Sequence, residues 1–239
     1  MLGYDNFSVN MKMMLGLPFE EGTGVITRDC AKPHHQDIDL INTPTWTTIA
    51  SGLGVIELNG ANEYLELAMA DSVDLDFTSE DYSIGGWINW ENGDTSQMII
   101  GRYDVDVAFT GWELYLTLWG GIFYLTTRHH HSLTIVDGQP RTACNSTGWT
   151  QNTWHFFGAS RTGSRAVHYR NGVPLTMICS TGGLVDPEPN ANDLTIGIRF
   201  TKNADRFKGM MWGLRVWNRV ITTAEWQQIY DMEKHWFVV

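Results

Sequence analysis

The sequence predicts an all-β fold, a two-sheet antiparallel β-sandwich with one short C-terminal helix. Short segments with alternating or β-rich composition recur along the chain, and Gly, Asn, Asp and Pro lie between them, as tight turns require. The 239 residues, 43% of them hydrophobic, suffice for one large sandwich with one core. We therefore expect a single domain over residues 1–239, with its core at about 15–230 and short terminal tails.

The expected strands, in chain order, lie at 9–15, 54–58, 63–67, 82–90, 98–103, 112–119, 122–127, 154–160, 166–170, 194–200 and 210–217. In the fourth of these, Tyr82, Ile84, Ile88 and Trp90 share one face, while Trp87 lies on the other face among small or polar residues. This alternation favours a half-buried central strand.

Two local signals predict a hairpin and a helix. Asn171-Gly172 follows an aromatic-rich strand and predicts a tight hairpin, because both turn positions need positive φ. Thr222 or Thr223 is expected to be the N-cap of a helix that has Glu225 in its first turn. We expect the aromatic side of this helix to pack on the sandwich.

The stretches 28–46 and 137–152 show the least regular pattern, and we expect them to be loops.

Composition excludes several classes of partner. The 16 Lys and Arg against 27 Asp and Glu give a net charge of −11, which repels phosphate backbones and argues against nucleic acid. No apolar stretch approaches the ~20 residues that span a bilayer, so we expect no membrane insertion. Cys30, Cys144 and Cys179 show no metal or redox spacing, and free, mostly buried thiols are expected.

The ordered pieces resemble a known family. LPFEEGTGVITRDCA, GVIELNGANEYLEL and DSVDLDFTSEDYSIGGWINW resemble the opening of laminin-G-like domains, the concanavalin A-like lectin/glucanase jelly rolls. NTWHFFGASRTGSRAVHYRNGVPL, LTIGIRF and RFKGMMWGLRVWNRVITTAEWQQIY are similar to the later strands and closing helix of that family. The resemblance implies a lectin-like β-sandwich, and several weak signals in one order are more specific than any one of them.

Calcium is the metal that this resemblance suggests, although no cofactor is certain. Many members bind it through Asp, Asn and loop carbonyl oxygens, which are hard ligands. The loops offer Asn59, Asn62, Glu63, Asp71 and Asp74 as candidates. However, the final strand carries Trp212 where the family often has an Asp, so plain turn chemistry is the favoured alternative.

Glycan recognition on such folds uses an aromatic ring against the apolar sugar face, with polar groups fixing the hydroxyls. The candidate platforms are Trp149, Trp112, Trp119, Tyr103 and Trp46. Burial in the core is the alternative for each of them, because 11 Trp in one sandwich cannot all be platforms. Trp149, flanked by polar turn formers, is the expected surface exception.

Catalysis has little support in the sequence. Glu-x-Asp, the start of the acidic strand motif in glucanases of this fold, is absent, as is a Gly-x-Ser-x-Gly elbow. His129 and His131 would share one face of a continued strand, but a metal there lacks supporting ligands, and an exposed polar strand end is favoured. We therefore expect no enzyme.

The expected function is a structural or recognition module. Because the chain begins at Met1 without a readable export signal, we expect a virion-associated protein, such as a phage capsid decoration or tail-appendage subunit on the virion surface. Its partners would be other protein subunits, a homo-oligomer among them, and glycans. A free-standing extracellular carbohydrate-binding lectin is the first alternative, and a glycan hydrolase or lyase the second.

Overall fold

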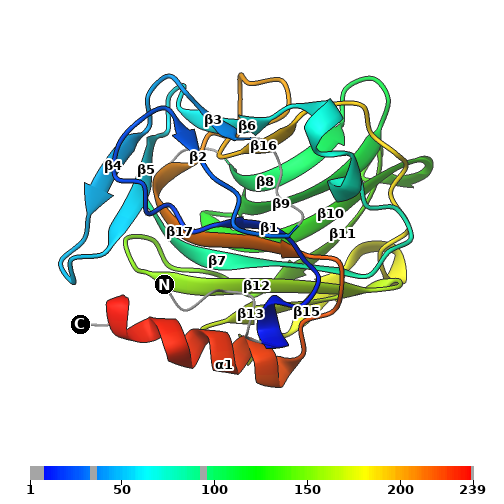
Figure 1. Ribbon diagram of the computed structural model, residues 1–239. Helices are drawn as coiled ribbons and strands as arrows, with labels where there is room; N and C mark the ends of the chain where they lie inside the picture. The colour runs from blue at the N-terminus through cyan, green and yellow to red at the C-terminus, as the bar shows by residue number, and fades with distance from the viewer. Residues whose placement is uncertain (1–7, 33–36, 92–95, 238–239) are drawn as a thin grey trace.

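The protein is an antiparallel β-sandwich whose two sheets pack face to face around one core (Figure 1). The computed structural model describes residues 8–32, 37–91 and 96–237. One sheet has eight strands, ordered β14-β13-β12-β7-β17-β5-β4 with β1 also paired to β17. The other has nine strands, ordered β15-β11-β10-β9-β8-β16-β6-β3-β2. The predicted fold class is confirmed.

The strands are β1 (Met13–Leu17), β2 (Ile26–Thr27), β3 (Ile38–Ile41), β4 (Thr45–Thr48), β5 (Gly54–Asn59), β6 (Tyr64–Leu67), β7 (Tyr82–Trp90), β8 (Gln97–Asp104), β9 (Thr110–Trp119), β10 (Ile122–Val136), β11 (Gln139–Ser146), β12 (His155–Thr162), β13 (Arg165–Arg170), β14 (Val173–Pro174), β15 (Met177–Cys179), β16 (Leu194–Ile196) and β17 (Lys208–Trp217). The helices are α1 (Thr223–Glu233) and the short 3-10 turns η2 (Ser8–Asn10), η3 (Met69–Asp71), η4 (Val73–Leu75), η5 (Ser180–Gly182) and η6 (Lys234–Trp236).

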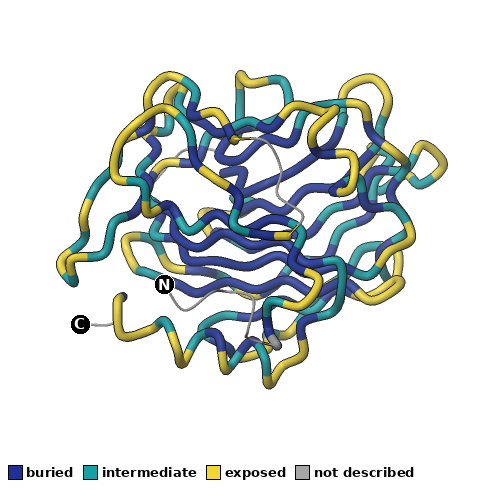
Figure 2. The backbone as a smooth tube through the Cα atoms, in the orientation of Figure 1, coloured by how far each residue is buried: buried dark blue, intermediate teal, exposed yellow. Residues whose placement is uncertain are grey.

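Strand β7 lies at the centre of the eight-stranded sheet, as predicted, but it is not half-buried. Tyr82, Ile84, Ile88 and Trp90 point into the core between the sheets. Trp87, on the opposite face, is equally buried under α1 and the C-terminal segment. The prediction of a half-buried strand was wrong because the helix covers the face that its pattern left open, as the continuous burial in Figure 2 shows.

Helix α1 packs closely on the eight-stranded sheet through Trp226. A Cβ atom on Gly85 would lie 2.5 Å from the Trp226 ring, and one on Gly158 would lie 2.9 Å from it, so only glycines allow this approach. The Trp226 Nε1–H donates to Ser160 Oγ at 3.0 Å. The predicted cap is also confirmed, because the Thr222 hydroxyl and the Glu225 carboxylate bond each other's backbone N–H groups.

Two turn and loop predictions have different outcomes. Asn171 and Gly172 both adopt positive φ, 54° and 80°, and connect β13 to β14, so the hairpin is confirmed. The predicted loop 137–152 instead contains β11, which pairs with β10 along the nine-stranded sheet, and 28–46 contains β3 and the start of β4. The short polar side chains of β11 gave no alternation strong enough to reveal it.

His129 and His130 of β10 are buried, against the expectation of an exposed strand end, while His131 is partly exposed. His129 points between the sheets, where Nδ1 lies 2.7 Å from the Val185 carbonyl oxygen and Nε2 lies 2.7 Å from Tyr82 Oη. His168 is buried there too, with Nε2 2.7 Å from Thr127 Oγ1. His131 Nε2, further along β10, lies 3.7 Å from Glu188 Oε1. His129 and His130 point to opposite faces of the sheet because side chains alternate along the strand, and His131 has a partner of its own.

Within the described ranges, no helix is long and apolar enough to cross a bilayer.

Acidification should destabilise the fold through its buried histidines. Burial lowers the pKa of His129 and of His168 to about 3 and that of His155 to about 4. Below pH 6.5 the unfolded chain takes up protons that the folded chain refuses, so the free energy of unfolding falls as pH drops from 6.5 toward 4. We expect a loss of about 2 kcal/mol per histidine at pH 5, measured by urea unfolding at pH 5.0 and 7.5.

The matched variants are H155Q, which removes one of these buried imidazole rings, and H235Q, which removes an exposed imidazole ring. The first should flatten the pH dependence and the second should leave it unchanged. Equal unfolding free energies at both pH values in the parent protein would contradict the prediction.

Candidate functional site

The outer faces of the two sheets differ in what covers them. Aromatic and aliphatic side chains bury the outer face of the eight-stranded sheet under α1 and the chain ends. The outer face of the nine-stranded sheet carries a hollow of about 400 Å³, which we call the groove. Its lining comes from β9, β10, β11, β15 and the β10–β11 turn: Tyr115, Thr117, Leu118, Trp119, Tyr124, Thr126, Arg128, Val136, Asp137, Arg141, Ala143, Asn145, Ile178, Cys179 and Ser180.

One end of the groove is aromatic. Trp119 ends β9 and is 74% exposed, and its ring centroid lies 6.4 Å from that of Tyr124 on β10. Gly120 and Gly121, both at positive φ, form the tight turn between these strands. A large exposed indole is rare on a protein surface and presents a flat apolar face to a ligand.

The middle of the groove is polar. Thr117 Oγ1 and Thr126 Oγ1 lie 2.7 Å apart across β9 and β10. Tyr115 Oη and Asn145 Oδ1 are buried atoms that have no hydrogen-bond partner within the described part of the chain. Since buried polar groups are normally paired, these two atoms favour the binding of water or of a ligand that carries hydroxyl groups.

The other end carries a buried charged cluster. Glu113 Oε1 accepts from Arg128 Nη1 at 2.9 Å and lies 2.9 Å from His130 Nε2. Burial works to raise the pKa of Glu113, but Arg128 and His130 outweigh it and hold this pKa below its usual value. The Arg128 guanidinium also stacks over the Tyr115 ring at 4.4 Å. Glu113 is therefore an ionised acceptor that fixes Arg128 in the groove floor.

A second cavity of about 290 Å³ adjoins this charged end. It shares Arg128 and Arg141 with the groove, so the two hollows adjoin each other, and we call them together the depression. Its other lining residues are Tyr103, Val105, Asp106, Glu113, Gln139, Arg199 and Asp205. Burial, with a contribution from Glu113, raises the pKa of Asp205.

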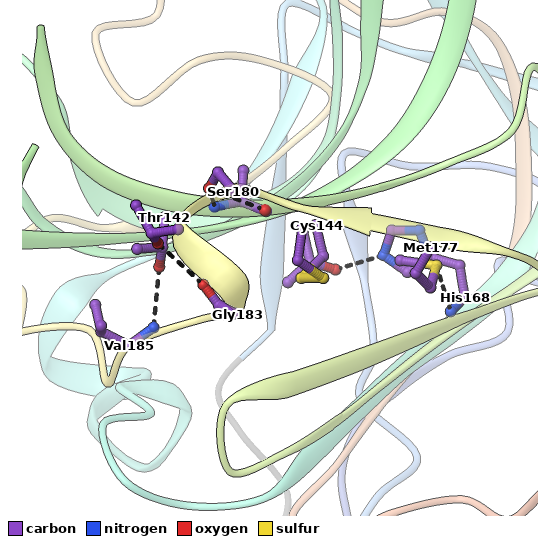
Figure 3. Close-up of a disulfide and its surroundings, with 11 residues drawn as sticks. Thr142, Cys144, His168, Met177, Ser180, Gly183 and Val185 are labelled. Carbon is purple, nitrogen blue, oxygen red and sulfur yellow. Dashed lines mark hydrogen bonds between the residues drawn. A yellow bond between two sulfur atoms is a disulfide. The ribbon is translucent and has the colours of Figure 1, made fainter. Parts of the chain in front are cut away.

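A disulfide holds the groove's outer wall. Cys144 of β11 bonds Cys179 of the edge strand β15 (Figure 3). Cys179, Ile178 and Ser180 line the groove. Beside it, Ser180 Oγ accepts from the Ala143 N–H at 2.8 Å. The prediction of free thiols was wrong for this pair, since the sheet register, invisible in the sequence, places the two cysteines opposite each other. Cys30 is free.

The structure places the five predicted aromatic platforms differently. Trp119 is exposed in the groove, and Tyr103 lines the second cavity with its ring stacked 5.5 Å from His130. Trp112 lies fully in the core, where Nε1–H donates to the Leu75 carbonyl oxygen. Trp46, half-buried on β4, donates to the Gly24 carbonyl oxygen. Only Trp119 and Tyr103 thus lie along the depression.

Trp149 is not the surface exception that its polar neighbours suggested. It is 4% exposed and packs in the core, where Nε1–H donates to Ser146 Oγ. A backbone bridge to Phe123 draws it inward. Tyr115, Tyr124 and Asn145 of the groove were not predicted from the sequence, although alternation from Trp119 along β9 places Tyr115 on the same face.

The predicted calcium ligands are used within their own loops. Asn59 Oδ1 accepts from the backbone N–H groups of Ala61, Asn62 and Glu63, and Glu63 Oε2 accepts from the Asn59 N–H at 2.8 Å. The structure brings these residues together as a turn. Asp71 and Asp74 lie apart from them, exposed on η3 and η4.

A family model described as the concanavalin A-like lectin/glucanases superfamily matches residues 59–226. Domain 4 of AbnA, a GH43 extracellular arabinanase from Geobacillus stearothermophilus, solved with arabinotriose, is 14% identical, with TM-score 0.66 over 92% of this chain and 98% of that chain. No curated protein sequence matches the chain.

Two toxin binding domains are similar over a part of their length. That of Paraclostridial Mosquitocidal Protein 1 is 13% identical, with TM-score 0.70 over 94% of this chain and 53% of that chain. The binding domain of botulinum neurotoxin DC, solved in complex with SialylT, is 12% identical, with TM-score 0.65 over 94% of this chain and 52% of that chain. This chain thus spans about half of each toxin domain, and at these identities the likeness shows a common fold.

Loss of the disulfide should destabilise the protein measurably. The cross-link joins residues separated by 35 positions, and closing a loop of that length contributes about 3–4 kcal/mol through the entropy of the unfolded chain. We expect C179A to lower the free energy of urea unfolding by about this amount. C30A, which removes the free thiol, is the control and should change it much less. A C179A protein as stable as the parent would contradict the prediction.

Proposed function

This chain belongs to the concanavalin A-like lectin/glucanases superfamily, and we propose that it binds glycans in the groove of its nine-stranded sheet without cleaving them. The observation that carries the proposal is the pairing of an exposed indole, Trp119, with unpartnered polar atoms along one depression. Sugars offer an apolar ring face and a rim of hydroxyls, and this arrangement matches both.

The size of the groove suits an oligosaccharide. Glu113 and Trp119 lie six positions apart on β9, which corresponds to about 20 Å along the strand. A chain of several sugar rings would lie over Trp119 and Tyr124 at one end and over Tyr115 and Asn145 further along. The neighbours solved with arabinotriose and SialylT are consistent with such a ligand class.

The charged cluster supports binding over cleavage. Glycoside hydrolysis needs one carboxyl that donates a proton and one carboxylate that is free to attack or to activate water. Glu113 Oε1 is already bonded by Arg128 and His130, and its lowered pKa makes it a poor base. We therefore propose a positioning role for Glu113, which holds Arg128 in the floor of the groove.

The disulfide supports a location outside the cytoplasm. Disulfides persist in oxidising compartments, at cell surfaces and on virions. We propose the extracellular side as the place of action. Association with a virion, expected from the sequence, stays a prediction, as does assembly with other protein subunits.

Replacement of Trp119 tests the groove directly. In W119A the apolar platform is lost, and stacking of a sugar on an aromatic ring contributes about 1–2 kcal/mol, so we expect affinity to fall about tenfold. The measurement is a glycan array followed by isothermal titration with the best oligosaccharide found.

W236A is the matched control, because Trp236 is also partly exposed but lies on η6, away from the groove. W236A should bind the oligosaccharide with the affinity of the parent. The oligosaccharide should also keep its length during the titration, because the proposed function is binding without cleavage. Equal affinity of W119A and the parent would refute the groove as the site, and binding to no glycan on the array would refute the function.

Calcium should not change the assembly state. The Asn59 and Glu63 oxygens are already engaged in a turn, which leaves a calcium ion few free ligands there. In size-exclusion chromatography with light scattering, we expect the same mass with calcium and with chelator. A mass that changes on chelation would contradict this prediction. The mass itself also bears on assembly, because a defined oligomer would favour the virion-type protein and a monomer would favour the free-standing lectin.

A further inference from the structure

We propose that the charged end of the groove is a subsite for an acidic sugar, whose carboxylate is bound by Arg128, Arg141 and Arg199. This inference rests on the proposed glycan binding and names the class of glycan. Three guanidinium groups line the second cavity, in a chain that has only 16 Lys and Arg and a net charge of −11. Three carboxylates, Asp106, Glu113 and Asp205, line the same cavity, so binding of an anionic ligand depends on the guanidinium donors that these carboxylates leave unused.

The guanidinium groups retain unused donors. The Nε atoms of Arg128 and Arg199 are both buried and have no hydrogen-bond partner within residues 8–32, 37–91 and 96–237. Guanidinium groups bind carboxylates through parallel N–H donors, and an unpaired buried donor costs free energy. A ligand carboxylate would supply the acceptor oxygens that these donors lack.

Arg141 is the most available of the three. Its ion pair is a long contact, 3.8 Å, to Asp137, whose side chain is 81% exposed. It lines both the groove and the second cavity, so it lies where a sugar chain would pass from one to the other. An exposed pair of this kind contributes little stability, and a ligand could displace it at small cost.

The acidic neighbours of the site are mostly engaged. Glu113 is bonded by Arg128 and His130, and Asp106 is paired with Arg199. Asp205 is the remaining carboxylate in the cavity. Its pKa is raised by burial and by Glu113, so its charge is already disfavoured, and a ligand carboxylate would repel it further. Asp205 should therefore oppose the binding of an acidic sugar.

The geometry gives the ligand a direction. The apolar face of one sugar would lie on Trp119, and the carboxylated sugar would lie at the opposite end of β9, beyond Tyr115. The tip of the β10–β11 hairpin contributes Val136 and Asp137 to the wall near Arg141. A chain with acidic units fits this order of aromatic, polar and cationic contacts.

The test compares two oligosaccharides that differ in the carboxylate alone, β-1,4-linked oligoglucuronate and β-1,4-linked oligoglucose of the same length, by isothermal titration and by a glycan array holding acidic and neutral glycans. We expect acidic glycans to be preferred. The preference should weaken at high salt, since charge attraction is screened.

Two variants should act in opposite directions. R141Q should weaken binding of the acidic ligand about tenfold, as loss of a charge-assisted hydrogen bond does, and should leave neutral ligands unaffected. D205N should strengthen acidic binding several-fold, and Asn tolerates the positive φ of 48° at this position. R165Q removes an exposed arginine on β13, outside the groove, and is the matched control.

The outcomes separate the two proposals. Neutral glycans bound as tightly as acidic ones, with R141Q and D205N both silent, would overturn the acidic subsite and leave glycan binding intact. Binding to no glycan of either kind would overturn both. Weakening by R165Q equal to that by R141Q would show general charge attraction and would also overturn the subsite.

Discussion

The close packing of Trp226 on Gly85 and Gly158 is the contact on which the rest of this structure depends. It anchors α1 on the eight-stranded sheet and encloses a second apolar cluster outside the sandwich core. Burial of large aromatic side chains at about 25 cal/mol per Å² makes this cover strongly favourable. One sheet face is thereby closed, and the face available for a ligand is that of the nine-stranded sheet.

On the open face, the buried carboxylate of Glu113 and the guanidinium group of Arg128 stabilise each other. Glu113 is buried and ionised because Arg128 and His130 bond it, and in return it keeps Arg128 stretched along the groove floor over Tyr115. Removing one partner of such a buried charge pair leaves the other uncompensated, which is costly. The charged part of the groove floor is therefore held by several contacts, whereas Trp119 at the aromatic end is exposed.

Sequence reasoning succeeded where local rules decide the outcome. The alternation of 82–90 gave the two faces of β7, the Asn171-Gly172 pair gave a hairpin, and Thr222 with Glu225 gave the helix cap. It failed where distant segments meet. Trp149 is drawn into the core by a bridge to Phe123, and β11 is a strand because β10 pairs with it.

The sequence by itself determined the β-sandwich and the closing helix, because periodicity, capping and turn chemistry act over a few residues. It also showed more tryptophans than one ligand site could use. Only the tertiary structure decided which tryptophan is exposed, which cysteines pair and which arginines share a cavity. Cys144 and Cys179 meet through strand register, and Arg128 and Arg199 meet because β10 and the segment after β16 border one hollow. Such contacts depend on how distant strands are ordered in the sheet, which residue spacing does not encode.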